Sequence, residues 1–424
     1  MARLRSIGLV GLTLLAILMR TAWAETLRVA AGESLVNALA RAQRGDTLLL
    51  GPGSHAGPVL ITVPGITLEG EPGAVIDGGG SGDSVHVSAA DVTLRHLTVR
   101  HSGQVLIDKN SGIFLDRDAD RARVEDCDLI DNLIAVYLDG PKDALVRNNH
   151  IVGLHLLHRS ERGPAVSLWN TPGSRIEDND IRAGRDGVFA VGSRKNLIAR
   201  NQFHDLRFAV HFMYTNDSEV ADNVSVGNDV GFVLMYSDRL AVHDNASVHD
   251  RDQGYVLNYA NGSRFEDNAA RDSEKCVFIY NANKNLFQRN WFEGCQIGVH
   301  FTAGSERNRI TENAFVANRT QVMYVGTRAL DWSVNGRGNY WSDNAAFDLN
   351  GDGIADTAYR PNDVVDQVIW RAPAAKLLLN GPAVQVLHWA QAAFPAIHPG
   401  GVIDSAPLMH PLRPQAVDRL EGAP

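Results

Sequence analysis

The chain has 424 residues, of which 44% are hydrophobic and 21% charged, so it holds enough apolar material for one long domain or two ordinary ones. Its formal net charge of −9 argues against a nucleic-acid partner, because binding to phosphate backbones depends on clustered Lys and Arg. Cys127, Cys276 and Cys295 are an odd number of cysteines, which does not indicate a disulfide framework. We expect all three to be buried as small apolar side chains.

The first 24 residues have the pattern of a secretory signal peptide. Arg3 and Arg5 form a basic start, residues 7–19 are apolar, and Ala22-Trp23-Ala24 is a small–x–small cleavage site. An uncleaved membrane anchor is the alternative, but the apolar run is short for a membrane span. We therefore expect the mature chain to lie outside the cytoplasm, in a bacterial periplasm.

Residues 25–60 are predicted to cap the N-terminal end of a repeat structure. Segment 34–43 has helical periodicity and begins at Ser34, a favourable N-cap residue. Gly45 and Asp46 are expected to end this helix, and residues 47–50 to open the first coil.

A short pattern recurs about every 22 residues through the middle of the chain. Its marker is an asparagine, and successive markers are 30, 22, 22, 22, 23, 22 and 23 residues apart: Asn149, Asn179, Asn201, Asn223, Asn245, Asn268, Asn290 and Asn313. Cys127 extends the series one step back. A large apolar residue stands three positions before each marker: Val124, Val146, Ile176, Ile198, Val220, Val242, Phe265, Phe287 and Ile310.

This period indicates a solenoid whose coils bury their apolar side chains only when stacked. Stacking lets each Asn amide bond to those above and below it, and Asn tolerates the left-handed backbone of a sharp turn. Leucine-rich repeats have a similar period, but they need a Leu-x-x-Leu-x-Leu pattern and Leu is sparse in these repeats. We therefore predict an all-β fold, a right-handed parallel β-helix over residues 25–345.

The spacing of 30 between Asn149 and Asn179 indicates one coil with eight extra residues, expected near 154–163. An insertion in a solenoid maps to a surface loop. This loop carries two histidines and two arginines, so it either contacts a partner or is a tolerated insertion.

Residues 346–424 form a third segment, which opens with a calcium-like loop. Carboxylates and an amide alternate and are followed by a glycine, as in the first half of an EF-hand loop; the candidate ligands are Asp348, Asn350, Asp352 and Asp356. Tyr359 stands where the loop would need a Glu. A metal-free Asx-turn is the alternative.

The tail after this loop is apolar. Residues 382–394 are predicted to form a short helix, and the remainder to Pro424 is expected to be extended. The helix either caps the end of the β-helix or docks on a membrane protein or another subunit.

A soft metal site is predicted from the alignment of coils. Adding 22 places Met213 on Met235, and strand alternation puts both on the outer face with His211. Thioethers and an imidazole suit Cu(I), which we expect to bind transiently. Methionines that merely fill gaps in the core are the alternative. His300 and Met323 are further candidates from later coils.

Catalysis is not expected. Glu125-Asp126, Glu177-Asp178 and Glu266-Asp267 recur at one repeat position, which is typical of turn residues rather than of a catalytic carboxylate pair. Because parallel β-helices commonly handle carbohydrate, a carbohydrate-binding or polysaccharide-cleaving enzyme is the alternative function.

Three C-terminal stretches carry a resemblance to a known family. They are Gly338-Asn-Tyr-Trp-Ser-Asp343 with the 348–353 loop, Val386-Leu-His-Trp-Ala-Gln391, and Pro399-Gly-Gly-Val-Ile-Asp-Ser-Ala-Pro-Leu-Met409. With the signal peptide and the Asn-marked coils, they resemble the NosD family, periplasmic β-helix proteins of nitrous oxide reductase maturation. The coils and the Asn-Tyr-Trp motif are shared with many β-helix proteins, whereas the tail is more specific.

The resemblance implies partners rather than a substrate. Proteins of this family sit on an ABC transporter made of a membrane permease and a cytoplasmic ATPase, which holds them peripherally at the inner membrane. They receive copper from a lipoprotein chaperone and support assembly of the copper–sulfur centre of nitrous oxide reductase. The resemblance assigns no ligand residues.

Overall fold

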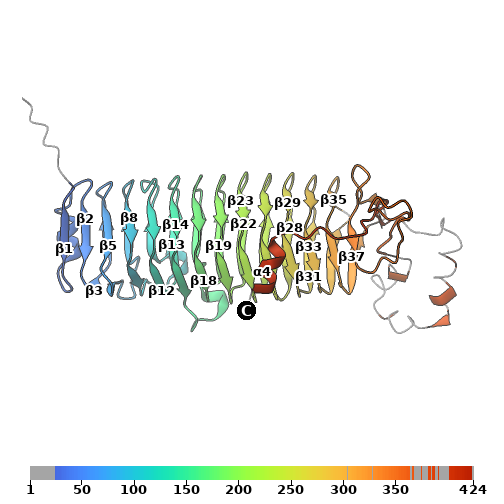
Figure 1. Cartoon of the computed structure of the whole chain (residues 1–424). Helices are drawn as coiled ribbons and strands as arrows, with labels where there is room; N and C mark the ends of the chain where they lie inside the picture. Colours follow the sequence, from blue (N-terminus) through green and yellow to red (C-terminus); the bar gives the residue numbers. More distant parts are fainter. Residues whose placement is uncertain are drawn as a thin grey trace, which may run out of the picture.

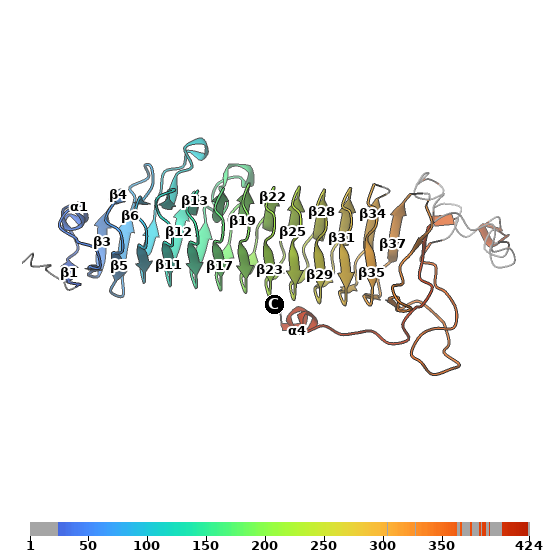
Figure 2. The same cartoon turned by 90° about the horizontal axis from the view of Figure 1, so that it is seen from above.

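The computed structural model describes residues 24–302, 304–326, 328–362, 365–366, 374, 381–382, 384–386, 390 and 401–422. Over these residues the chain is a right-handed parallel β-helix, an elongated rod of stacked coils (Figures 1 and 2). The predicted fold class is therefore confirmed. The predicted signal peptide lies outside the described residues, apart from Ala24.

The coils supply strands to three parallel sheets. The first sheet runs β1 (Thr26–Val29), β2 (Thr47–Leu50), β5 (Thr67–Gly70), β8 (Thr93–Arg95), β11 (Arg123–Glu125), β14 (Leu145–Arg147), β17 (Arg175–Glu177), β20 (Leu197–Ala199), β23 (Glu219–Ala221), β26 (Ala241–His243), β29 (Arg264–Glu266), β32 (Leu286–Gln288) and β35 (Arg309–Thr311).

The second sheet runs β4 (Val59–Ile61), β7 (Val85–Val87), β10 (Ser111–Leu115), β13 (Ile134–Asp139), β16 (Val166–Trp169), β19 (Asp186–Val191), β22 (Phe208–Met213), β25 (Val230–Met235), β28 (Gln253–Asn258), β31 (Lys275–Tyr280), β34 (Ile297–Thr302) and β37 (Thr320–Val325).

The third sheet runs β3 (Gly53–Ala56), β6 (Ala74–Asp77), β9 (Thr98–Arg100), β12 (Asp128–Asn132), β15 (His150–Gly153), β18 (Asp180–Arg182), β21 (Gln202–His204), β24 (Val224–Val226), β27 (Ala246–Val248), β30 (Ala269–Arg271), β33 (Trp291–Glu293), β36 (Ala314–Val316) and β39 (Tyr340–Trp341).

Few other elements have described bounds. They are the helices α1 (Leu35–Leu39) and α4 (Ala416–Gly422), the 3-10 turns η1 (Leu106–Asp108) and η2 (Arg159–Glu161), and the strand pair β38 (Leu330–Asp331) and β40 (Val402–Ile403). In the part of the chain that the structure describes, none of the helices is long and apolar enough to cross a membrane.

The apolar residues that precede each marker form a continuous column inside the rod. All nine of them are at most 3% exposed. Strand pairing sets them directly above one another, as in Ile198 over Val220 and Val220 over Val242. The prediction that this position faces the interior is confirmed, and it makes the column the centre of the first sheet's contribution to the core.

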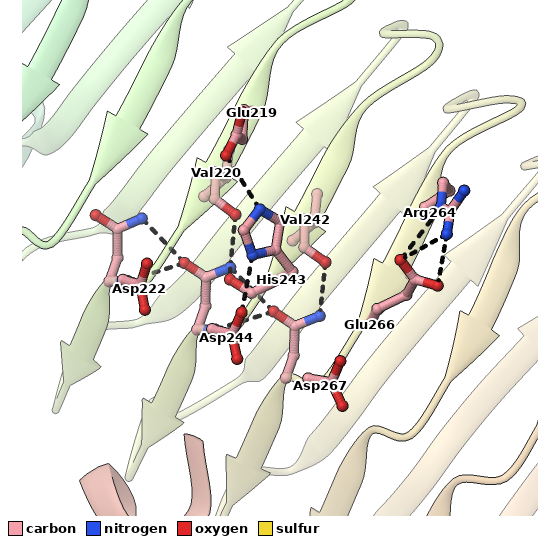
Figure 3. Close-up of polar contacts among 12 residues, drawn as sticks. Glu219, Val220, Asp222, Val242, His243, Asp244, Arg264, Glu266 and Asp267 are labelled. Carbon is pink, nitrogen blue, oxygen red and sulfur yellow. Dashed lines mark hydrogen bonds and ion pairs between the residues drawn. The ribbon is translucent and has the colours of Figure 1, made fainter. Parts of the chain in front are cut away.

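The marker asparagines form a buried amide ladder beside this column (Figure 3). Each side-chain NH2 donates to the Oδ1 of the next Asn, at 2.8–3.0 Å, from Asn149 through to Asn339. The same Oδ1 also accepts the backbone N–H of the Asn below, as Asn201 N–H does to Asn223 at 3.0 Å. Every rung thus satisfies backbone groups that the turn would otherwise leave buried without a partner.

The left-handed residue of this turn is not the Asn, so that part of the prediction is wrong. Positive φ belongs to the residue before the marker, for example Arg200 (φ 55°), Asp222 (φ 59°) and Asp244 (φ 55°). The physical reason is direction. The left-handed residue reverses the chain and stays at the surface, which turns the following Asn inward where its amide can bond along the stack.

The N-terminal cap matches its prediction with one difference. The Ser34 hydroxyl accepts the N–H of Asn37, at 3.2 Å, and Leu35, Ala38 and Leu39 of α1 are buried over the first coils. However, β1 precedes the helix and pairs with β2, so the first coil begins before the helix rather than at residue 47.

The C-terminal segment is not extended throughout, as the sequence suggested. Residues 416–422 form α4, which lies against the third sheet with Ala416, Val417 and Leu420 buried (Figure 1). Figure 2 shows the chain running back along the rod to reach this place. The amphipathic spacing of three apolar residues finds an apolar surface there, and this contact stabilises the helix. The predicted 382–394 helix lies largely outside the described residues.

The expectation for the cysteines is wrong for two of the three. Cys276 and Cys295 form a disulfide, and Cys127 is buried and free. The disulfide joins neighbouring coils, because residues 275 and 297 are register partners. A separation of 19 residues is three short of one coil, so the repeat alone does not bring the two cysteines together.

The extra residues of the long coil form the expected surface loop between β15 and β16. Leu154 and Leu157 pack against the outer face of the second sheet, and Arg159 forms an ion pair with Asp229. Arg162 donates to the carbonyl of Ala183 at 3.2 Å. The loop is therefore held against the coils that follow it.

Removal of one ladder amide is expected to destabilise the rod. Asn201→Ala leaves buried partners of Asn179 and Asn223 unsatisfied, which should lower the free energy of unfolding by about 2–4 kcal/mol. The neighbouring Gln202→Ala removes an exposed amide and should cost less than about 0.5 kcal/mol. Urea unfolding followed by circular dichroism measures both; equal effects would contradict the ladder's stabilising contribution.

A buried carboxyl should make stability depend on pH. Asp250 is fully buried, accepts bonds from Ser225, Ser247 and the Asn228 N–H, and has its pKa raised from 3.8 to about 6 by burial. A raised folded-state pKa means that its contribution is present below pH 4 and lost as the pH rises through about 6.

Asp250→Asn removes that loss, because an amide cannot ionise and the serine hydroxyls can accept its protons. At pH 7 the variant should be more stable by about 3 kcal/mol, and the difference should vanish near pH 4. Thermal unfolding across this range tests it. Parallel curves for the two chains would show that Asp250 does not titrate in this window.

Candidate soft-metal site on the second sheet

Two of the predicted copper ligands lie side by side on the second sheet. Met213 ends β22 and Met235 ends β25, and the two are register partners in the parallel pair. Both side chains are partly exposed, while Phe212 between them and the core is fully buried. The structure thus places both thioethers on the outer face, about 4.8 Å apart at the backbone. Metal binding there stays a prediction.

His211 occupies the same face but is less accessible than expected. It is 8% exposed, because the rings of Phe189 and Phe208 lie against it at centroid distances of 4.8 and 5.1 Å. Its Nδ1 lies 3.4 Å from a carboxylate oxygen of Asp186. Its Nε2 is buried and has no hydrogen-bond partner among the described residues.

Asp186 is the residue of this site that the sequence did not reveal. Its side chain is fully buried, and Arg207 donates two bonds to it, at 2.8 and 2.6 Å. Burial alone would raise the pKa of Asp186, but the bonds from His211 and Arg207 outweigh it and the pKa is lowered. The carboxylate therefore stays ionised and can hold the imidazole in place. Asp186 pairs with Phe208 in the strand register, so counting back 22 from residue 208 was the available signal.

This arrangement is typical of a metal-binding imidazole. Such a ring usually donates one N–H to a carboxylate, which fixes its orientation and leaves the other nitrogen as the ligand. With Nδ1–H directed at Asp186, the Nε2 of His211 presents a lone pair. A buried ring nitrogen without a partner fits a ligand better than a filler of the core.

The calcium-like loop has a different geometry. The two carboxylate oxygens of Asp348 accept the N–H groups of Gly351 and Gly353, at 2.7 and 2.8 Å. Asn350 accepts from Asp352, and Asp356 accepts from Leu349. These bonds have the form of the metal-free Asx-turn alternative. Within the described residues, no three His, Cys, Asp or Glu side chains come together as a metal-binding group.

The recurring Glu-Asp pairs are neutralised within the turns. Glu177 is 2% exposed and ion-paired with Arg175 and Arg200. Glu266 is likewise paired with Arg264, and Figure 3 shows this pair beside the amide ladder. Carboxylates held in this way by arginines contribute to the turn, as expected from their repeat position.

Comparison with known proteins identifies relatives over most of the chain. A family model described as "Periplasmic copper-binding protein (NosD)" matches residues 154–346. The "Probable ABC transporter binding protein NosD" of Stutzerimonas stutzeri is 38% identical over 372 residues, covering 84% of this chain and 85% of the relative. The protein of the same name from Pseudomonas aeruginosa is 37% identical over 374 residues, covering 85% and 87%.

Solved structures show a shared fold at much lower identity. The A-module of the Azotobacter vinelandii mannuronan C-5 epimerase AlgE6 has a TM-score of 0.56 at 13% identity, covering 72% of this chain and 92% of that one. A mannuronic-acid-specific polysaccharide family 6 lyase from human gut microbiota has a TM-score of 0.55 at 12% identity, covering 72% and 83%. At these identities the likeness concerns the β-helix alone.

Loss of the Asp348 carboxylate should loosen its loop. Asp348→Ala removes the acceptor of two backbone N–H groups, so amide hydrogen exchange should accelerate over residues 348–356 while the coils stay protected. Calcium titration of the wild-type chain tests the metal prediction in the same assay. Slower exchange on adding calcium, absent in the variant, would support a metal loop; no calcium response would favour the Asx-turn.

Proposed function

The chain belongs to the NosD family, and on that premise we propose that it handles Cu(I) as a periplasmic accessory protein of an ABC transporter. In this proposal the protein receives copper from a lipoprotein chaperone and supports metal-centre assembly of nitrous oxide reductase. A membrane permease and a cytoplasmic ATPase are its partners and hold it at the inner membrane. The relatives' printed name and the family's printed description support the transporter, the copper and the location.

The observation that carries the proposal is the combination of side chains on the second sheet. Met213 and Met235 offer two thioethers from adjacent coils, and His211 offers a ring nitrogen without a partner. Soft thioethers with an imidazole select Cu(I) over harder cations. Because copper is cargo in this proposal, partial exposure of the methionines suits a site that must both accept and release the ion.

The proposal includes no catalysis. The candidate carboxylate pairs are bound by arginines in the turns, so they lack the free carboxylates that a glycoside-cleaving site requires. The alternative, a carbohydrate-processing β-helix, draws on the solved enzymes, whose likeness is limited to the fold. Turnover of a uronic-acid polymer by the purified protein would favour that alternative.

Cu(I) binding should depend on the two methionines. The double variant Met213→Leu with Met235→Leu keeps apolar side chains of similar volume, so the fold should persist while about one equivalent of bound Cu(I) is lost. Competition with a Cu(I) chelator under anaerobic conditions measures this. The control is Met409→Leu, which removes a thioether outside the second sheet and should leave binding unchanged. Unchanged Cu(I) binding by the double variant would contradict the proposed site.

A further inference from the structure

A second histidine lies on the same outer column as His211, nearer the C-terminal end of the rod. Strand pairing continues this column through Val233, Val256 and Phe278 to His300 of β34. His300 is four coils beyond His211, which corresponds to about 19 Å at the spacing of stacked strands. The three intervening residues have no metal-ligating atoms, so the two histidines cannot belong to one cluster.

A methionine stands next to His300. Met323 of β37 is its register partner in the next coil, so the two side chains leave the sheet on the same face from adjacent strands. Both are partly exposed, whereas Phe301 and Tyr324 beside them in the chain are buried inside the rod. The pair repeats, at the end of the rod, the neighbouring imidazole and thioether found near β22.

The ring of His300 has an unused nitrogen. Its Nδ1 is buried without a hydrogen-bond partner among the described residues. Burial and the positive charge of Lys275 lower the pKa of His300, so the ring is neutral at pH 7 and its nitrogens are available as ligands. The Phe278 ring lies at a centroid distance of 5.0 Å and restrains the imidazole from one side.

The distribution of soft ligands over the chain is not even. Of the six methionines in the sequence, Met213, Met235 and Met323 lie on the outer face of the second sheet. Among the described histidines, three have a buried ring nitrogen without a partner; His211 and His300 share this column, and the third, His55, is enclosed inside the rod. Methionines chosen only to fill the core would not gather outside it.

We propose that His300 and Met323 form a second Cu(I) site, separate from the one at His211, Met213 and Met235. The inference takes its metal from the proposed function but rests on different residues. Cu(I) accepts low coordination numbers with soft ligands, so one imidazole and one thioether suffice to hold it weakly. Two weak sites on one face let the rod carry copper at two positions along its length.

The test counts Cu(I) equivalents with the full-length mature protein. The wild-type chain should bind about two equivalents against a competing chelator, and Met323→Leu or His300→Phe should bind about one. Phe is chosen at 300 because its ring retains the packing on Phe278. Met409→Leu is again the control and should bind about two, and circular dichroism establishes that each variant is folded.

The outcomes separate the two sites. If Met323→Leu and His300→Phe retain every equivalent while the Met213 and Met235 double variant loses one, the second site is wrong and the proposed function stands. If the 323 and 300 variants lose one and the double variant loses none, the second site holds and the first is wrong. Titration with Ag(I), a redox-inert substitute, should also shift the imidazole ¹⁵N resonances of His300; no shift would overturn its assignment as a ligand.

Discussion

The buried asparagine ladder is the interaction on which the rest of this structure depends. Each coil must turn from the first sheet into the third, and the turn directs backbone N–H and C=O groups into a region without water. An Asn amide has both donors and an acceptor, so one rung satisfies its own turn and the turn of its neighbour. A coil whose Asn slipped by one position would lose bonds on both sides. This requirement holds the period near 22 and sends extra residues, as in the 154–163 loop, to the surface.

The ladder also explains how the rod ends. At its N-terminal side Cys127 takes a marker position, and its backbone N–H still donates to Asn149 at 3.0 Å. At the other end Asn339 is the last Asn rung, and Asp404 receives its N–H at 2.6 Å together with the indole N–H of Trp341 at 2.8 Å. A buried carboxylate from far along the chain therefore terminates the amide stack. The family-like stretch at 399–409 thus has a structural function in closing the β-helix.

The same stacking decides what the outer faces offer. Because coils repeat in register, any residue type that recurs at an outer position forms a line along the rod, as arginines and carboxylates do around Glu177. The second sheet instead collects imidazoles and thioethers, beside aromatic rings. Mannuronan-processing enzymes have the same β-helix at 12–13% identity, so the fold does not dictate chemistry. The outward side chains do.

Much of this protein could be predicted from its sequence, because a repeat is a local pattern that also fixes distant contacts. The period predicted the β-helix, the inward column, the Asn ladder and the adjacency of Met213 and Met235, since register follows from counting. It could not reveal the burial of His211, the contact with Asp186, the Cys276–Cys295 disulfide, or the closure of the ladder by Asp404. Those depend on side-chain directions between coils, or on a tail that returns to the rod from outside the repeat. The tertiary structure alone decides such contacts, because no periodicity relates their partners and only packing brings them together.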